Sequence, residues 1–366
     1  MSPRPGSAFR VGAALASIAL VMAAACGEPP LEPVVVAPVE GLQGFEASLD
    51  NIRVGLKIPG LAAAIAEGGE IVWSRGFGLA DVEQGRPATD TTSFYVASVT
   101  KSVAAIVLMQ LVEEGRVNLD DPITDYGVNL AANGVVTVKH VFSHTSEGTP
   151  GTVFRYNGAR YIKLGNVMLE ATGQTFAELL AERILRPLGL RHTAPDVELL
   201  ADFYVTGLPR QAFLANVAMP YELVDGQVVP YARLRHFSPA AGLVTSVRDL
   251  ARISIALDAG QLLGAAAREE MLSPTIEING PTRTYGLGWY VQTVQGVKLE
   301  WHFGLALGHS SLLIRAPQPG LTFVVVANTS RLTAAYDMGA ADIMATGPGR
   351  LFVESFVLAT SPSPPR

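Results

Sequence analysis

One segment of the chain has to lie inside the folded protein. Residues 98–114 read Ser-Val-Thr-Lys-Ser-Val-Ala-Ala-Ile-Val-Leu-Met-Gln-Leu-Val-Glu-Glu, a helix-favouring stretch with apolar side chains on nearly every side. A helix that is apolar all round is buried, so the rest of the chain must enclose it. Lys101, near the start of this helix, is then removed from water, and desolvation lowers the pKa of an amine.

The spacing of Ser98 and Lys101 predicts a nucleophile and its base. Residues three apart share a helix face, so hydroxyl and amine can meet. The chain has 22 arginines but five lysines, and of these two cations only lysine readily loses its proton. A neutral amine can take the serine proton, as in serine hydrolases with a lysine base. The alternative is an ordinary helix start, with Ser98 as N-cap and Lys101 as a solvated charge.

The order of the other elements predicts an α/β protein whose sheet comes from both ends of the chain. Apolar runs at 61–66 and 71–78 flank Gly68-Gly69 and predict a hairpin. Further strands are expected at 286–293, 311–315 and 321–327, and helices at 45–57, 98–114, 175–186, 246–257 and 334–343. We expect sheet regions at about 41–92 and 280–350, a mainly helical region at about 93–279, and a C-terminal tail at 351–366.

The first 40 residues are expected to be a targeting signal followed by a tether. Arg4 and Arg10 precede an apolar run at 11–25 that is short for a membrane span. The run ends in Ala-Ala-Ala-Cys at 23–26, which resembles a bacterial lipobox, although Ala23 stands where leucine is most usual. We predict a lipoprotein signal peptide at 1–25, lipidation of Cys26, a proline-rich tether at 26–40, and attachment to a membrane of the bacterial cell envelope. The alternative is a secreted protein cut near Ala25.

Composition narrows the function further. The chain is 49% hydrophobic and 16% charged with a net charge of −6, so it is globular and offers no basic patch for nucleic acid. Cys26 is the only cysteine, which excludes an intramolecular disulfide. The six histidines are scattered without His-Glu-x-x-His spacing, so no metal or other cofactor is expected. The Gly-x-Ser-x-Gly elbow of α/β-hydrolases is absent.

Seven segments carry a resemblance to a known family. They are Phe94-Tyr-Val-Ala-Ser-Val-Thr-Lys101, 142–146, 154–157, 184–193, 240–246, 285–289 and His302-Phe-Gly304. In this order they resemble the penicillin-recognising serine hydrolases, more narrowly the branch of class C β-lactamases, D-alanyl-D-alanine carboxypeptidases and their esterase relatives. The resemblance covers about residues 45–345. It implies an α+β fold, with an antiparallel sheet built from both chain ends, flanking helices and a mainly helical insert.

The same resemblance implies roles for the second motif of the family. Tyr156 matches the family tyrosine, which would help Lys101 to move protons between the serine and the leaving group. The motif reads Tyr156-Asn157-Gly158, with glycine in place of the family asparagine. Asn157 is a candidate substrate-binding residue. His144 lies in a segment that recurs in the family as a structural loop, so we interpret it as supporting the site and not as a base.

His302-Phe-Gly304 stands where the family has Lys-Thr-Gly. His302 would donate a hydrogen bond or, when charged, attract a substrate carboxylate. Gly304 permits close approach of substrate to the strand edge. By resemblance, the backbone N–H groups of Ser98 and Leu305 form the oxyanion hole.

Together these residues predict two-step acyl transfer through an acyl-enzyme on Ser98. The expected substrate is a small molecule or peptide, either an ester or a D-amino peptide. A true β-lactamase is one alternative. A catalytically weak or inactive envelope binding protein on the same fold is another.

Overall fold

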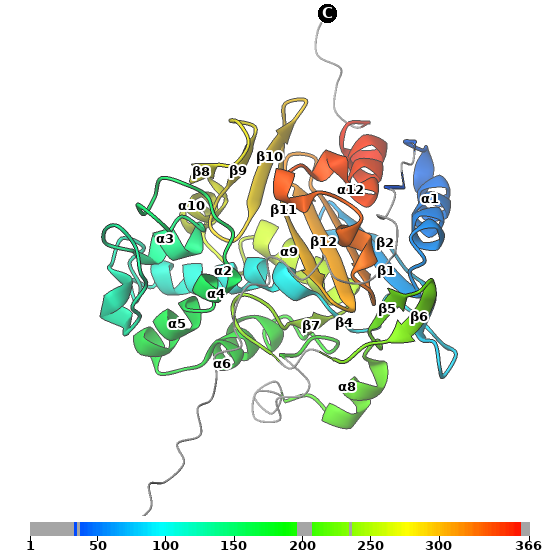
Figure 1. Cartoon of the computed structure of the whole chain (residues 1–366), viewed down its shortest axis with the longest axis horizontal. Coiled ribbons are helices and arrows are strands. Elements are labelled where there is room, and N and C mark those ends of the chain that lie inside the picture. The colour runs from blue at the N-terminus through cyan, green and yellow to red at the C-terminus, as the bar shows by residue number, and fades with distance from the viewer. Residues whose placement is uncertain (1–32, 35–36, 196–206, 234–235, 360–366) are drawn as a thin grey trace, which may run out of the picture.

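The computed structural model describes residues 33–34, 37–195, 207–233 and 236–359. A large sheet with helices on one side forms one part of the molecule, and a helical region forms the other (Figure 1). Cys26 and the expected signal peptide lie outside the described residues. Within those residues, no helix combines the length and the apolar character that crossing a bilayer requires.

The sheet confirms the predicted fold class. In the described part of the chain it has nine strands in the order β3-β2-β1-β13-β12-β11-β10-β9-β8, and all neighbours are antiparallel. Strand β1 pairs with β13, which joins the two chain ends at the middle of the sheet. The strands are β1 Gly60–Glu67, β2 Glu70–Asp81, β3 Arg86–Pro87, β8 Ile276–Glu277, β9 Arg283–Tyr285, β10 Tyr290–Val294, β11 Val297–Ala306, β12 His309–Ala316 and β13 Leu321–Ala327.

Alternation along the central strands creates two cores. Successive side chains of a strand point to opposite faces of the sheet. In β13, Val324 and Val326 belong to the core shared with the helical region, whereas Phe323 and Val325 belong to the core on the other face. Every residue of β13 is buried, since both faces are covered.

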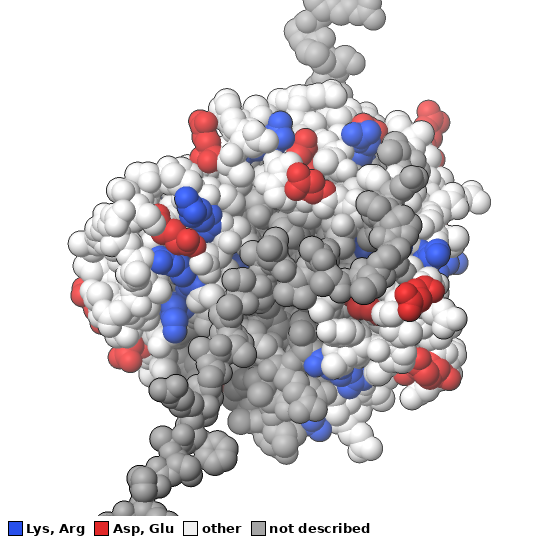
Figure 2. Space-filling view, in the orientation of Figure 1, with Lys and Arg blue, Asp and Glu red and all other residues white. Residues whose placement is uncertain are grey.

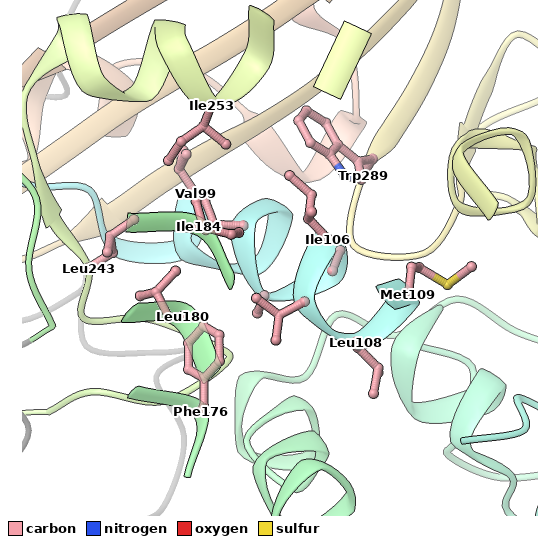
Figure 3. Packing of buried hydrophobic residues seen from close by; sticks show 14 of the residues in the cluster. Val99, Ile106, Leu108, Met109, Phe176, Leu180, Ile184, Leu243, Ile253 and Trp289 are labelled. Atoms are coloured by element: carbon pink, nitrogen blue, oxygen red, sulfur yellow. The ribbon is translucent and has the colours of Figure 1, made fainter. Parts of the chain in front are cut away.

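The buried helix predicted at 98–114 is the centre of the helical region. It begins as a 3-10 turn over Ala97–Val99 and continues as α2, Thr100–Glu113. Figure 3 shows its side chains among residues from several other segments, including Phe176, Ile253 and Trp289. The other helices are α1 Gly41–Gly55, α3 Val138–Phe142, α4 Gly158–Tyr161, α5 Leu164–Thr172, α6 Phe176–Leu180, α8 Arg210–Asn216, α9 Val247–Asp258, α10 Ala265–Leu272, α11 Arg331–Ala334 and α12 Gly347–Phe352.

Two short ribbons lie outside the large sheet. One joins β4, Phe94–Tyr95, to β7, Val244–Thr245, next to the 3-10 turn, and the other joins β5, Tyr221–Val224, to β6, Gln227–Pro230. On the face shown in Figure 2, acidic and basic side chains of the described residues are interspersed among uncharged ones.

The structure does not place the start of the expected C-terminal tail at residue 351. Helix α12 runs through that position and continues as a π-helical turn over Val353–Val357, with Leu351, Phe352, Val353 and Val357 buried. These side chains pack with α1 on the outer face of the sheet (Figure 1). The helix expected at 334–343 is instead the short α11 followed by 3-10 turns.

One predicted strand starts too early, and its partner β11 was expected only around the motif His302-Phe-Gly304. Residues 287–289 form a bend, and the strand begins at Tyr290. Gly288 adopts φ +78° in this bend, and only glycine fits there, because a Cβ would lie 2.8 Å from the Cβ of Ala105 on α2. Strand β11 follows β10 directly and carries the His302-Phe-Gly304 motif.

The outer face of the sheet offers a stability test. Phe352 is fully buried and stacks on Phe323 with ring centroids 5.0 Å apart. We expect Phe352→Ala to lower the free energy of unfolding by about 3–5 kcal/mol, because it leaves a cavity. Urea unfolding measures this. The control Leu42→Ala, on α1 and 37% exposed, should change it by less than about 0.5 kcal/mol. Equal effects of the two variants would contradict the packing described here.

Candidate active site

The candidate nucleophile lies on a strained turn between β4 and α2. Ala97 has a left-handed backbone with φ +45°, a conformation that costs a non-glycine residue about 1–3 kcal/mol and persists only where the surroundings enforce it. The Thr100 hydroxyl enforces it by donating to Ala97 O at 2.6 Å and accepting from Leu243 N at 3.1 Å. The turn therefore holds Ser98 in a fixed position at the entry of the buried helix.

Lys101 points back at this turn. Its Nζ lies 2.9 Å from Ser98 Oγ and donates to Ala240 O at 2.8 Å. The residue is 1% exposed, and burial lowers the pKa of Lys101 to about 7. Near neutral pH a large share of the amine is thus unprotonated and can accept the Ser98 proton. The ordinary helix start is excluded, because the N-cap of α2 is Val99, without a side-chain cap, and Lys101 is not solvated.

Tyr156 completes the group. Its ring centroid lies 4.8 Å from Lys101 Nζ. Although 38% of the residue is exposed, desolvation raises the pKa of its phenol above the usual value, against the opposing effect of a hydrogen bond with the Ser98 side chain. The phenol therefore stays protonated at neutral pH and can serve as a proton donor beside the serine. The structure thus brings Ser98, Lys101 and Tyr156 together as the sequence predicted.

The edge of β11 closes the site on the other side. A Cβ on Gly304 would lie 2.2 Å from Val96 O, so only glycine allows the strand to press against the nucleophile turn. Ser311, opposite Gly304 on β12, donates to the same Val96 carbonyl at 2.7 Å. Strand β10 pairs with β11 only as far as Trp301, so in the described residues the later part of β11 has a strand on one side alone. Leu305, the second candidate donor of the oxyanion hole, lies on this open edge.

His302 is neutral and fully engaged. It is 0% exposed, and its Nδ1 donates to Phe303 O at 2.7 Å. Its Nε2 therefore carries a lone pair and accepts from the Tyr285 hydroxyl at 3.3 Å. Burial, and secondarily the charge of Lys101, lower the pKa of His302 to about 3. A charged His302 that attracts a substrate carboxylate is therefore not what the structure presents.

Asn157 has a capping role. Its Oδ1 accepts from Arg160 N at the start of α4, and its Nδ2 donates to Glu147 at 2.6 Å. Both polar atoms of the predicted substrate-binding side chain are thus used within the protein. At the next position, a Cβ on Gly158 would meet no atom within 4 Å. The place where the family carries asparagine is open space in this chain.

Sequence reasoning gave no roles to several residues that shape the site. Ala240 supplies the carbonyl that holds Lys101, and the Tyr161 ring lies 5.4 Å from Lys101 Nζ. Ala240 and Tyr285 both lie in segments that carried the family resemblance, and this was the one sequence signal that could have assigned them to the site. Among the described residues, no group of three or more histidine, cysteine, aspartate or glutamate side chains could hold a metal.

Comparison with known proteins identifies the family to which the chain belongs. The fold is that of the β-lactamase and penicillin-binding protein class. A family model described as Beta-lactamase matches residues 48–346, and the chain therefore belongs to this hydrolase family.

Individual relatives include an esterase. Esterase EstB of Burkholderia gladioli is 28% identical over 360 residues, which cover 78% of this chain and 90% of EstB. PbpX of Bacillus subtilis is 28% identical over 257 residues, and the chain spans 61% of its length. The octameric penicillin-binding protein homologue from Pyrococcus abyssi superposes with a TM-score of 0.73 at 25% identity, covering 84% of this chain and 78% of the homologue. The D-amino acid amidase from Ochrobactrum anthropi SV3 shares the fold, with a TM-score of 0.69 at 22% identity over 87% of this chain and 97% of its own.

The pKa of Lys101 predicts a pH profile. If neutral Lys101 is the base, kcat/KM for an uncharged ester should fall about tenfold per pH unit below about pH 7 and level off above it. Burial lowers the pKa of both His144 and His302, so neither should contribute to this limb. The measurement is kcat/KM from pH 5 to 9, corrected for spontaneous hydrolysis. A flat profile between pH 5 and 7 would exclude this base.

The same buried amine predicts a stability cost. Its pKa falls from 10.5 to about 7 on folding, and each pKa unit corresponds to about 1.4 kcal/mol. We expect Lys101→Met to lose activity and yet to unfold at a higher urea concentration at pH 7. The gain should shrink as the pH rises from 7 towards 10.5, because in this window the unfolded wild-type chain keeps a proton that the folded state has released. A gain that does not change with pH would contradict this origin.

Proposed function

We propose that the chain is a serine hydrolase that cleaves esters through an acyl-enzyme on Ser98. The contact between the buried Lys101 amine and the Ser98 hydroxyl carries this proposal. Lys101 takes the hydroxyl proton while Ser98 Oγ bonds to the carbonyl carbon. The backbone N–H groups of Ser98 and Leu305 would stabilise the negative charge on the carbonyl oxygen. The carbon–oxygen bond to the leaving group then breaks.

The proton next goes to the leaving group. Tyr156, whose ring lies 4.8 Å from Lys101 Nζ, donates its proton to the departing alkoxide and recovers one from the lysine. Water then attacks the acyl-enzyme, with the same groups acting in reverse, and releases the acid. In this scheme every proton transfer involves a group of this chain, and no cofactor takes part.

The neutral state of His302 favours uncharged substrates. β-Lactams and peptides ending in a free acid carry a carboxylate, and burying a carboxylate without a positive partner is costly. The family lysine that could supply such a partner is replaced here by a histidine whose two nitrogens are occupied. Gly158 also stands in place of the family asparagine that would hold an acyl amide, and the space beside it is open. Both departures support an ester over a β-lactam or a D-peptide, and the esterase relative agrees with them.

The first experiment separates an enzyme from a binding protein on the same fold. The purified chain is incubated with a fluorophosphonate probe and analysed by intact mass. We expect a single adduct that is missing in Ser98→Ala. A well-folded wild-type protein that does not label would favour the binding protein.

The second experiment tests the substrate class with a matched pair of esters. We expect kcat/KM for p-nitrophenyl acetate to exceed that for p-nitrophenyl hydrogen succinate at pH 7.5 by at least about tenfold, equivalent to about 1.4 kcal/mol. The two esters share the leaving group and differ mainly in the acyl carboxylate. Equal rates, or turnover of a chromogenic cephalosporin as fast as of the acetate, would overturn the preference for uncharged esters.

A further inference from the structure

His144 has a backbone that it would not adopt without support. It is the second residue after α3, next to the C-cap Ser143, and its φ is +57°, in the left-handed region. A non-glycine residue there costs about 1–3 kcal/mol, and such residues cluster at functional sites. His144 is also 2% exposed, so the cost is borne in the interior of the protein.

His144 forms hydrogen bonds with the backbone on both sides of Tyr156. Its carbonyl oxygen accepts from Arg155 N at 2.8 Å, and its ring nitrogen Nδ1 accepts from Asn157 N at 3.1 Å. Between these two hydrogen bonds, the imidazole packs on the Tyr156 ring, with centroids 4.4 Å apart and planes tilted by 33°. One residue thus contacts the backbone before the tyrosine, the tyrosine ring itself, and the backbone after it.

The imidazole also contacts the wall behind the lysine. It stacks on Tyr161 with centroids 5.1 Å apart, and the Tyr161 hydroxyl donates to Lys101 O at 3.3 Å. The Tyr285 ring meets it edge to face at 5.3 Å. The imidazole therefore connects the loop of Tyr156 to the first turn of α2, which carries Lys101.

His144 cannot act as the base itself. Its Nδ1 lone pair is used by the Asn157 N–H, so the ring hydrogen lies on Nε2, which has no hydrogen-bond partner among the described residues. Burial, followed by the charges of Lys101 and His302, lowers the pKa of His144 well below its usual value. The ring therefore remains neutral, and its Nδ1 remains an acceptor, over the pH range in which the site works.

We propose that His144 is a positioning residue, which fixes the Tyr156 hydroxyl relative to Ser98 and Lys101 by holding the backbone on both sides of that tyrosine and packing on its ring. The inference rests on the proposed function, because it assumes that the Tyr156 hydroxyl moves a proton. It goes further by assigning the strained loop at the end of α3 to one step of the reaction.

Two substitutions separate the hydrogen bond from the ring. His144→Phe keeps a flat ring but removes the acceptor, and leaving the partly buried N–H of Asn157 unsatisfied should shift the loop. His144→Asn keeps an oxygen acceptor, and asparagine tolerates the left-handed backbone, but it lacks the ring. We expect kcat/KM to fall about 30- to 100-fold in His144→Phe, mostly through kcat, since small misplacements of catalytic groups are costly. His144→Asn should recover to within about five- to tenfold of the wild type.

Repeating both substitutions in a Tyr156→Phe background tests the mechanism. If His144 acts through Tyr156, either substitution should cost less than about threefold once the hydroxyl is gone. Equal losses in both backgrounds would show that His144 acts elsewhere and would overturn the proposal. Should His144→Phe fail to fold, as judged by circular dichroism and Tm, the smaller loss of His144→Asn must vanish in the same background. Full activity of Tyr156→Phe alone would instead refute the proton role in the proposed function.

Discussion

The removal of one amine from water is the constraint on which the rest of the structure depends. Helix α2 is buried on nearly all sides, so the first turn that carries Lys101 is dry. A dry amine gives up its proton near neutral pH, and the Ser98 hydroxyl lies within hydrogen-bonding distance. The sheet, α9 and the smaller helices all supply parts of the enclosure (Figure 3). The large core that the composition allowed therefore also sets the chemistry of the site.

The site has the same electrostatic character throughout. Burial keeps both nearby imidazoles, His144 and His302, neutral and keeps the Tyr156 phenol protonated. Each neutral imidazole offers a lone pair where a cation would offer only hydrogens, and both lone pairs are used to hold neighbouring groups. Family members that place a lysine at the position of His302 have a charge there that this chain lacks. Under the proposed function, this missing charge affects which substrates bind more than how Ser98 is activated.

The sequence predicted that Ser98, Lys101 and Tyr156 lie together, but it predicted less about the residues around them. Ser98 and Lys101 were identifiable because a serine and a lysine one turn apart on an apolar helix form a specific pattern, and Tyr156 because of the motif around it. The capping role of Asn157 was not predicted, because an asparagine that caps a helix and one that binds a substrate look the same in a sequence. The helix at 347–357 was missed, since Gly347-Pro-Gly349 suggests a break and the buried residues after it gain their stability from α1 and the sheet. The strand at 297–306 contains polar residues whose burial depends on tertiary contacts.

The joining of the two chain ends has a consequence for biosynthesis. Gly60 donates a backbone hydrogen bond to the side chain of Asn328, 268 residues later, at the seam where β1 meets β13. While a ribosome is still making the middle of this protein, β1 can pair only with β2, and an isolated two-stranded hairpin is only marginally stable in water. The pairing of β1 with β13 cannot form until almost the whole polypeptide has emerged from the ribosome. Folding is therefore a late event, and a chain that is cut short leaves its first strands without the neighbour they need.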